Sequence, residues 1–516
     1  MHEAPRTAPA APPAVSEPLA PGLKQRHLTM LGLGGVIGAG LFVGSGAGIA
    51  VAGPAIVVSY LIAGALAMLV MRMLGEMSTA MPASGSFSVH AERALGRWAG
   101  FSVGWLYWFL LVVVLAVEAT AAAQIAHGWV PAVEPWAWVL LFMVVFTAAN
   151  LTAVKNFGEF EFWFASLKVG AIVVFLGLGV LAVLGWLPDT DPVGMTNLTG
   201  QGGFLPNGWD GVVAGVLTVV FAFGGLEVVT IAAAETADPA RAVGRAVRSA
   251  VVRILFFYVG SMLVIVTVLP WTAQQAGLSP YVKVLDAIGV PSAGQIMNIV
   301  VFVALLSALN ANLYGSSRMV FSLAERGEAP RGLLKVSGGS QGRPGTDGAS
   351  GTGGGVPRRA VLASVAFGFV SVLLNLLWPD TVFLYMLNSV GAVLLFVWAL
   401  IAASQLRLRA RLEREAPQAL ALRMWCFPYL TWLTLAGLMG VLLLMLTDDG
   451  ARPQVLWSAG GDGAGGAGGG GPSTAGAAGA REVRARKVQA RGVRAREVRF
   501  FPPVGACAPC VSLVPV

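Results

Sequence analysis

The sequence predicts an all-α polytopic membrane protein. Of its 516 residues, 56% are hydrophobic and only 12% are charged, whereas soluble globular proteins carry about 25% charged residues. The chain also contains many apolar runs of roughly 20 residues, the length of helix that crosses about 30 Å of hydrocarbon. Helices are expected because backbone groups in lipid must pair within their own segment, and the alternating ten-residue segments of a membrane β-barrel are not seen.

The apolar runs predict eleven spans, at about residues 28–51, 55–74, 99–126, 136–153, 160–187, 211–234, 250–270, 293–324, 359–377, 381–404 and 425–446. Basic residues gather in alternate connecting segments, and the positive-inside rule then places the N-terminus in the cytoplasm. The outer loops before span eleven hold Lys283 alone, whereas one inner segment holds Arg241, Arg245 and Arg248. We therefore expect a multi-pass protein of the inner (plasma) membrane.

Three low-complexity segments divide the chain. Residues 1–22 are rich in Ala and Pro and predict a disordered cytoplasmic tail. Residues 23–458 hold the transmembrane domain, interrupted by a Gly/Ser-rich insert at 336–356 that we expect to be flexible and cytoplasmic. Residues 459–516 form a Gly- and Arg-rich tail that carries most of the net charge of +8. A nucleic-acid or anionic-lipid tether is one interpretation of these arginines. A disordered tail without a partner is favoured over it, so we expect no nucleic-acid partner.

The first span contains a candidate binding site. It reads Gly32-Leu-Gly-Gly-Val-Ile-Gly-Ala-Gly-Leu-Phe-Val-Gly-Ser-Gly46, and each glycine weakens a helix by about 1 kcal/mol relative to alanine. This density of glycine predicts a broken helix, which membranes tolerate only where it lines a cavity or is buried in protein. The freed N–H groups suit a carboxylate and the freed carbonyls suit an ammonium group. Together they suit the two ends of an amino acid; close helix packing through small residues is the alternative.

Span six repeats the pattern, since it reads Phe221-Ala-Phe-Gly-Gly-Leu-Glu227. Paired interruptions at corresponding positions of two five-helix halves are typical of a transporter binding site. Phe221 and Phe223 are candidates for an aromatic gate over the substrate. Tyr107 and Trp108 in span three are further candidates, with a place at the membrane interface as their alternative.

Charged residues inside spans are functional candidates because they are costly in lipid. Lys168 lies near the middle of span five, and Glu161 lies two helical turns earlier on the same face. A buried lysine can gain and lose a proton during a transport cycle. We therefore interpret Lys168 as a proton-coupling group, with a static ion pair as the alternative. Glu118 in span three is a second candidate, for which a structural role is the alternative.

Other classes of protein are disfavoured. The three cysteines are too few for a disulfide framework, and the four histidines are scattered, so we expect no metal and no cofactor. No paired His or nucleophile motif sits at a predicted membrane edge, so we expect no enzyme. A channel would need a repeated charged or carbonyl ring. A nutrient sensor built on a transporter fold remains as an alternative from another class.

Several motifs carry a resemblance to a known family. The chain resembles bacterial amino-acid permeases of the amino acid–polyamine–organocation superfamily, and among these most of all the γ-aminobutyrate (GABA) permeases. The matching pieces cover about residues 22–458 and include Leu23-Lys-Gln-Arg-His-Leu-Thr-Met30, Gly35-Val-Ile-Gly-Ala-Gly-Leu-Phe-Val-Gly44, Met71-Arg-Met-Leu-Gly-Glu-Met77, Gly158-Glu-Phe-Glu-Phe-Trp163, Val229-Thr-Ile-Ala-Ala-Ala-Glu235 and Tyr429-Leu-Thr-Trp432.

The resemblance implies twelve helices with a five-plus-five inverted-repeat core, alternating access and proton-coupled uptake. It implies that the substrate binds at the interruptions of spans one and six, and that the coupling lysine is Lys168. Related permeases for proline, histidine or aromatic amino acids share many of the motifs, and an amine exchanger would use the same fold. The implied substrate residues are Ile37, Gly38, Ala39, Gly40, Phe223, Gly224 and Gly225, and the gate candidate Phe221 joins them.

The chain departs from the family after Leu456-Trp457-Ser458, where the expected twelfth helix gives way to glycine and then arginine. An odd number of spans would place this basic tail outside, against the positive-inside rule. The simplest hypothesis is an altered reading frame near residue 459. Sequencing the gene tests it: a one-base shift should restore an apolar helix.

Overall fold

The described part of the chain is built from helices, with no strand among them. The computed structural model describes residues 37–447 apart from 84, 153, 188–194, 229, 231–240, 242, 246, 248–253, 275–277, 335–357 and 379–381. The expectations for the tail at 1–22, the insert at 336–356 and the tail at 459–516 lie outside these residues. So do Gly32, Gly34 and Gly35 of the first predicted break and the motif at 231–235.

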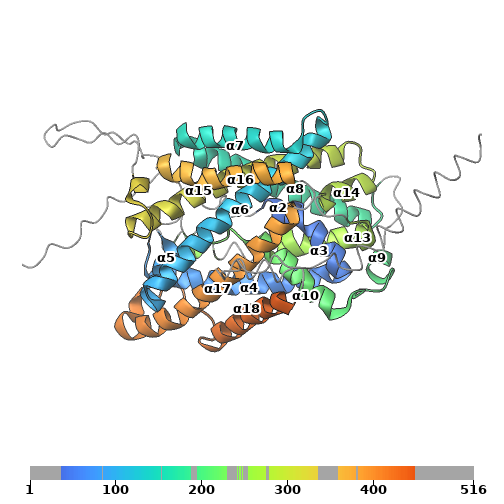
Figure 1. The fold of residues 1–516 in the computed structure, drawn as a ribbon. Helices are drawn as coiled ribbons and strands as arrows, with labels where there is room; N and C mark the ends of the chain where they lie inside the picture. The colour runs from blue at the N-terminus through green and yellow to red at the C-terminus, as the bar shows by residue number, and fades with distance from the viewer. Residues whose placement is uncertain are drawn as a thin grey trace, which may run out of the picture. The chain divides into compact units, whose positions relative to one another are not determined.

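The longest helices form most of the described part of the chain. They are α4 (Ile56–Ala80), α6 (Arg97–Trp129), α7 (Pro135–Thr152), α8 (Val154–Val183), α15 (Ala293–Glu325), α16 (Arg358–Leu377), α17 (Val382–Glu415) and α18 (Tyr429–Thr447) (Figure 1). Shorter helices and turns connect them or interrupt the spans. These are α2 (Ala39–Phe42), α3 (Gly44–Ala52), η1 (Gly53–Ala55), α5 (Ser86–Leu95), α9 (Thr196–Thr199), α10 (Gly208–Val219), η2 (Val220–Phe223), η3 (Ile254–Val259), α13 (Gly260–Val268), η4 (Trp271–Ala273), α14 (Pro280–Ala287), η5 (Arg331–Leu334) and η6 (Pro417–Ala419).

Six helical stretches in the described residues are long and apolar enough to cross a membrane. They are Gly44–Ala80, Arg97–Trp129, Glu161–Val183, Ala293–Glu325, Ser389–Glu415 and Tyr429–Leu446, and three shorter apolar helices accompany them at Pro135–Leu151, Gly208–Phe223 and Phe256–Val268. The prediction of an all-α membrane protein is therefore confirmed. The count of eleven spans stays a prediction.

One helix continues well past its predicted end. The apolar run predicted a span that stops at 404, whereas α17 runs to Glu415. Its last turns carry charged pairs spaced four residues apart: Arg409 Nε lies 2.8 Å from Glu413, and Arg411 Nε lies 2.9 Å from Glu415. Such pairs support a helix in water, so the helix continues where its hydrophobicity ends.

Helices α6 and α15 make the most extensive contact between two elements of the unit. Small residues allow this close approach, as is common between membrane helices. A Cβ atom added to Gly104 would lie 2.6 Å from Leu323 Cδ2, and one added to Gly315 would lie 3.3 Å from Leu111 Cδ1. This contact holds the two helices whose side chains line the cavity described below.

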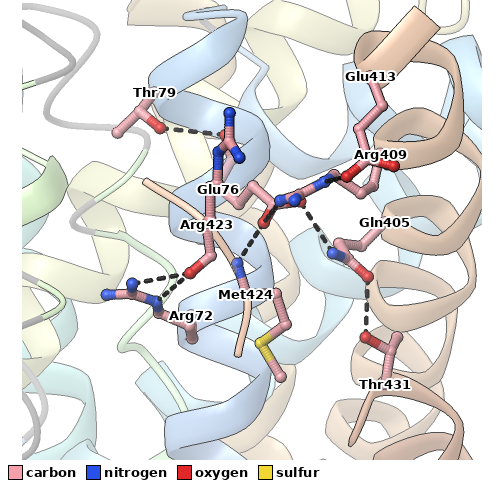
Figure 2. Close-up of polar contacts among 9 residues, drawn as sticks. All are labelled: Arg72, Glu76, Thr79, Gln405, Arg409, Glu413, Arg423, Met424 and Thr431. Atoms are coloured by element: carbon pink, nitrogen blue, oxygen red, sulfur yellow. Dashed lines mark hydrogen bonds and ion pairs between the residues drawn. The ribbon is translucent and has the colours of Figure 1, made fainter. Parts of the chain in front are cut away.

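A buried ionic cluster joins the end of α4 to α17 and to the segment that precedes α18 (Figure 2). Glu76 of α4 is 1% exposed and accepts hydrogen bonds from Arg409 Nη1 at 2.6 Å, from Gln405 Nε2 at 2.9 Å and from the backbone N–H of Met424. Gln405 in turn accepts from Thr431 Oγ1 of α18 at 3.1 Å. The Glu76 carboxylate therefore ties three separate segments together.

Arg72 strengthens the same junction one turn earlier on α4. Its Nε and Nη2 atoms donate to the carbonyl oxygen of Arg423 at 3.0 and 2.8 Å, as Figure 2 shows. Its guanidinium also lies over the ring of Trp425, 4.8 Å from the centroid, which adds a cation–π attraction. Arg409 of α17 contacts the same loop, because its guanidinium lies over the ring of Phe427, 5.4 Å from the centroid.

Candidate functional site

The first span is irregular at the predicted position. Helix α2 begins at Ala39 after Gly38, whose φ of −147° and ψ of −145° are not helical. The backbone N–H of Ala39 donates to both carboxylate oxygens of Glu118 on α6, each at 3.0 Å. A helix N-terminus favours an anion because its amide groups lack intrahelical partners. In this structure that anion site is filled by the protein's own carboxylate.

The sixth predicted span is irregular as well. Helix α10 ends at Val219, the chain tightens into η2, and the backbone then becomes extended at Gly224, with φ −64° and ψ 144°. Gly225 follows with φ 95°, a conformation that favours glycine because it has no Cβ atom. Its N–H donates to Glu227 Oε2 at 3.0 Å, so the turn is stabilised by a carboxylate.

That carboxylate has further partners. Glu227 is fully buried and accepts from Tyr107 Oη at 3.2 Å and from Trp398 Nε1 of α17. Both oxygens are therefore occupied by donors, which explains how a charged group is held at this depth. Tyr107 and Trp108 are both buried, and Trp108 Nε1 donates to Ser364 Oγ at 3.0 Å. Both aromatic side chains therefore project into the protein toward hydrogen-bond acceptors.

The two irregular segments touch one another at Gly40. A Cβ atom added there would lie 2.7 Å from Ala222 Cα and 3.0 Å from Phe221 Cδ1. Glycine is therefore required for the two backbones to meet. A small cavity of about 20 Å³ lies beside this contact, room for about one water molecule.

The cavity is lined by four parts of the chain. The two irregular segments contribute Gly40 together with Phe221, Ala222, Gly224 and Gly225. Helix α6 contributes Leu110, Val114 and Glu118, and α15 contributes Asn312. An amino acid does not fit in this volume, so substrate entry requires the surrounding helices to move apart.

The predicted lysine lies outside the cavity wall. Lys168 is fully buried, and its Nζ atom lies 3.8 Å from Glu161 Oε1. The prediction that these two residues share a helix face is confirmed. Glu161 is 2% exposed, and its other oxygen accepts from Ser307 Oγ at 2.8 Å. The pair thus connects α8 to α15 in the protein interior.

Aromatic side chains surround Phe223, which is buried and does not line the cavity. Its ring stacks on Tyr258 at a centroid distance of 5.0 Å and lies 5.9 Å from the ring of Tyr60. Tyr258 belongs to η3, a π-helical turn, and its hydroxyl donates to the carbonyl oxygen of Ala222 at 3.0 Å. Rare π-helical turns are frequent at functional sites.

The structure separates the predicted site residues into two groups. Gly40, Phe221, Gly224, Gly225 and Glu118 line the cavity. Those that do not are Ile37, Gly38, Ala39, Phe223 and Lys168, although Ala39 contacts Glu118 directly. Four further residues line the cavity but were not among the predicted site residues: Ala222, Leu110, Val114 and Asn312. For Asn312 a signal was present, since it is a polar residue in the apolar span at 293–324.

Apolar helices, two facing irregular segments and a buried cavity between them define a membrane transporter. In overall fold the chain is similar to a mutant form of the manganese transporter of Eremococcus coleocola, with a TM-score of 0.54 over 91% of each chain and 13% sequence identity. At that identity the likeness concerns the fold alone.

The sequence identifies the family. The amino acid permease family matches residues 27–461, and the chain belongs to this family. It is 48% identical over 434 residues to the γ-aminobutyric acid permease of Bacillus subtilis, a match that covers 84% of this chain and 89% of the relative. It is also 48% identical over 444 residues to the aromatic amino acid transport protein AroP of Corynebacterium glutamicum (85% and 92%). The γ-aminobutyric acid permease of Escherichia coli is 43% identical over 436 residues (84% and 90%).

Proposed function

We propose that the protein imports a small amino acid, with GABA as the first candidate, by proton symport. The observation that carries the proposal is the contact of two irregular helices around a buried cavity, with a carboxylate bound at the N-terminus of α2. GABA permeases among the relatives favour GABA. The equally similar AroP favours an aromatic amino acid as the second candidate.

The substrate carboxylate would bind where Glu118 lies now. The Ala39 N–H is one donor that two carboxylates cannot share without repulsion, so the substrate must displace the Glu118 side chain or find it neutral. A proton on Glu118 removes its charge and weakens its hold on Ala39. We expect this competition to link substrate binding to proton uptake.

Lys168 would accept the proton or pass it on. It lies in the same buried region and is paired with Glu161 at 3.8 Å. A change in the charge of Glu118 alters the field at Lys168, because buried charges are poorly screened. We expect the lysine to return the site to its starting protonation state after the substrate leaves.

Alternating access would move the N-terminal helices relative to their neighbours. In the orientation proposed from the basic residues, with the N-terminus in the cytoplasm, the Glu76–Arg409 cluster lies on the cytoplasmic side. The cavity holds about 20 Å³, so we expect the helices around it to move apart when the substrate enters.

Uptake into proteoliposomes tests the proposal. Radiolabelled GABA is offered with and without an inward proton gradient, and unlabelled proline, histidine and phenylalanine serve as competitors. Gradient-driven accumulation that the competitors barely affect is the expected result. Uptake of phenylalanine in place of GABA would change the substrate and keep the class. Binding without net flux would contradict transport and favour a sensor.

Two variants test the coupling. Glu118→Gln and Lys168→Ala should lose gradient-driven accumulation while they still exchange internal for external substrate. Lys283→Ala is the matched control, since this half-buried lysine of α14 donates to the Ala273 carbonyl and does not line the cavity. Accumulation by either site variant that still follows the proton gradient would exclude that residue as a coupling group.

A further inference from the structure

Asn312 presents an unused hydrogen-bond acceptor next to the cavity. It lies on α15, is 8% exposed, and its Nδ2 atom donates to the carbonyl oxygen of Ala308 at 2.8 Å. Because a carbonyl oxygen can only accept, the amide atom that faces it must be the nitrogen. The Oδ1 atom is therefore the acceptor that remains, and in the described residues it has no protein partner.

The helix face that carries this acceptor packs against the break of the first span. Ala308 and Asn312 are four residues apart and share one face of α15. A Cβ atom added to Gly38 would lie 2.9 Å from Ala308 Cβ. Asn312 thus lies one turn along the same face, and its side chain lines the cavity beside Gly40.

Several of the other acceptors near the cavity are already in use. The carbonyl oxygen of Gly38 accepts from Leu41 N and Phe42 N, that of Phe221 accepts from Gly224 N, and that of Ala222 accepts from Tyr258 Oη. Both oxygens of Glu118 accept from Ala39 N. A ligand that fills the cavity excludes water from Oδ1, so a ligand group that donates to Asn312 keeps this acceptor paired.

We infer that Asn312 Oδ1 accepts a hydrogen bond from the ammonium group of the substrate and selects for ligands that carry one. The inference rests on the proposed function and adds a specificity residue to it. A neutral acceptor suits a zwitterion. In the proposed mode the Ala39 N–H, now bound to Glu118, takes the carboxylate, and Asn312 takes the amine without adding a second fixed negative charge. A ligand without the amine leaves Oδ1 unpaired and binds more weakly.

Equilibrium binding to the purified full-length protein measures this selection. The ligands are two pairs that differ by the amine alone: GABA with butyrate, and phenylalanine with 3-phenylpropionate. For the pair whose amino acid binds, the Kd of the ligand without the amine is divided by the Kd of the ligand with it. This ratio is compared between wild type and Asn312→Leu, a substitution that keeps the side-chain volume and removes the acceptor. We expect the ratio to fall about tenfold or more, the scale of one hydrogen bond to a charged group.

A second substitution on the same helix is the control. Asn310 lies two residues away, and its Oδ1 accepts from Asn150 Nδ2 at 2.7 Å, so it faces another helix. Asn310→Leu should keep the wild-type ratio. If Asn312→Leu fails to fold, Asn312→Ala must show the same fall in the Kd ratio.

The outcomes separate the two claims. Wild-type protein that binds no amino acid of the panel would overturn the proposed function, and the role of Asn312 with it. Wild-type protein that binds one, with Asn312→Leu and Asn312→Ala keeping the full ratio, would overturn the role of Asn312 alone. A lower Kd ratio in both Asn312 variants, together with a wild-type ratio in Asn310→Leu, supports the proposed function and the role of Asn312.

Discussion

The hydroxyl of Tyr258 donates to the carbonyl oxygen of Ala222 across a distance of 3.0 Å. The two residues are 36 positions apart, and Tyr258 is 1% exposed. Ala222 lies in the short turn η2, where regular helical bonding ends, and it lines the cavity. Tyr258 therefore stabilises the backbone at Ala222, where the regular hydrogen bonds of the preceding helix have ended.

Replacing Tyr258 by phenylalanine removes this hydrogen bond and leaves the ring stacked on Phe223. We expect the KM for uptake to rise about fivefold, the equivalent of about 1 kcal/mol, with little change in Tm. Tyr429→Phe is the matched control because Tyr429 is 80% exposed. An unchanged KM in Tyr258→Phe would show that the Ala222 peptide is held by other contacts.

Gly38→Ala should nearly abolish uptake. The added methyl group would overlap the Glu118 carboxylate and lie 2.9 Å from Ala308 Cβ. It would push apart α6, α15 and the start of α2, where Ala39 binds Glu118. Uptake normalised to the amount of inserted protein measures the effect.

The control for that substitution is Gly177→Ala in α8, where an added Cβ atom meets nothing within 4 Å. Alanine is favoured over glycine inside a helix by about 1 kcal/mol, so this variant should transport normally and unfold at the same or a slightly higher temperature. Normal transport by Gly38→Ala would contradict the close packing at the first break.

Arg409→Met should destabilise the protein by about 3–5 kcal/mol, because removal of one partner leaves the buried Glu76 charge without its cation. Thermal unfolding in detergent measures the loss. Arg411→Met provides a comparison on the same helix: the Arg411–Glu415 pair is 62% and 61% exposed, and exposed pairs contribute about 0–1 kcal/mol. Equal effects of the two substitutions would mean that the buried cluster adds no particular stability.

The stability of the protein should fall in mild acid because of His90. This histidine of α5 is fully buried, and burial, with a smaller contribution from Arg93, lowers its pKa from 6.5 to about 3. The unfolded chain binds the proton below about pH 6.5, whereas the folded protein does so only near pH 3. Acidification through this range therefore favours unfolding.

The expected loss between pH 6.5 and pH 5 is about 2 kcal/mol at 1.36 kcal/mol per pH unit. His90→Gln, which can still reach Ser78, the partner of His90 Nε2 at 3.3 Å, should remove this part of the acid dependence. Melting temperatures at several pH values measure it. An acid dependence as steep in the variant as in wild type would assign the effect to other groups.

Much of the architecture was accessible from the sequence because it depends on local composition. Apolar runs of sufficient length must become helices in lipid, so the predicted spans at 99–126 and 293–324 correspond to α6 and α15. The shared helix face of Lys168 and Glu161 followed from helical spacing alone, since residues seven apart lie on one face. The glycine-rich segments predicted irregular backbone because glycine is a poor helix former.

The sequence alone therefore determined the class of protein, its all-helical build and the two segments where helices break. Only the tertiary structure decided which side chains meet at those breaks. Glu118 reaches the amide of Ala39 across 79 residues, and Asn312 comes to the same cavity from α15. Such contacts depend on how whole helices are rotated and packed, which the periodicity of one segment does not specify.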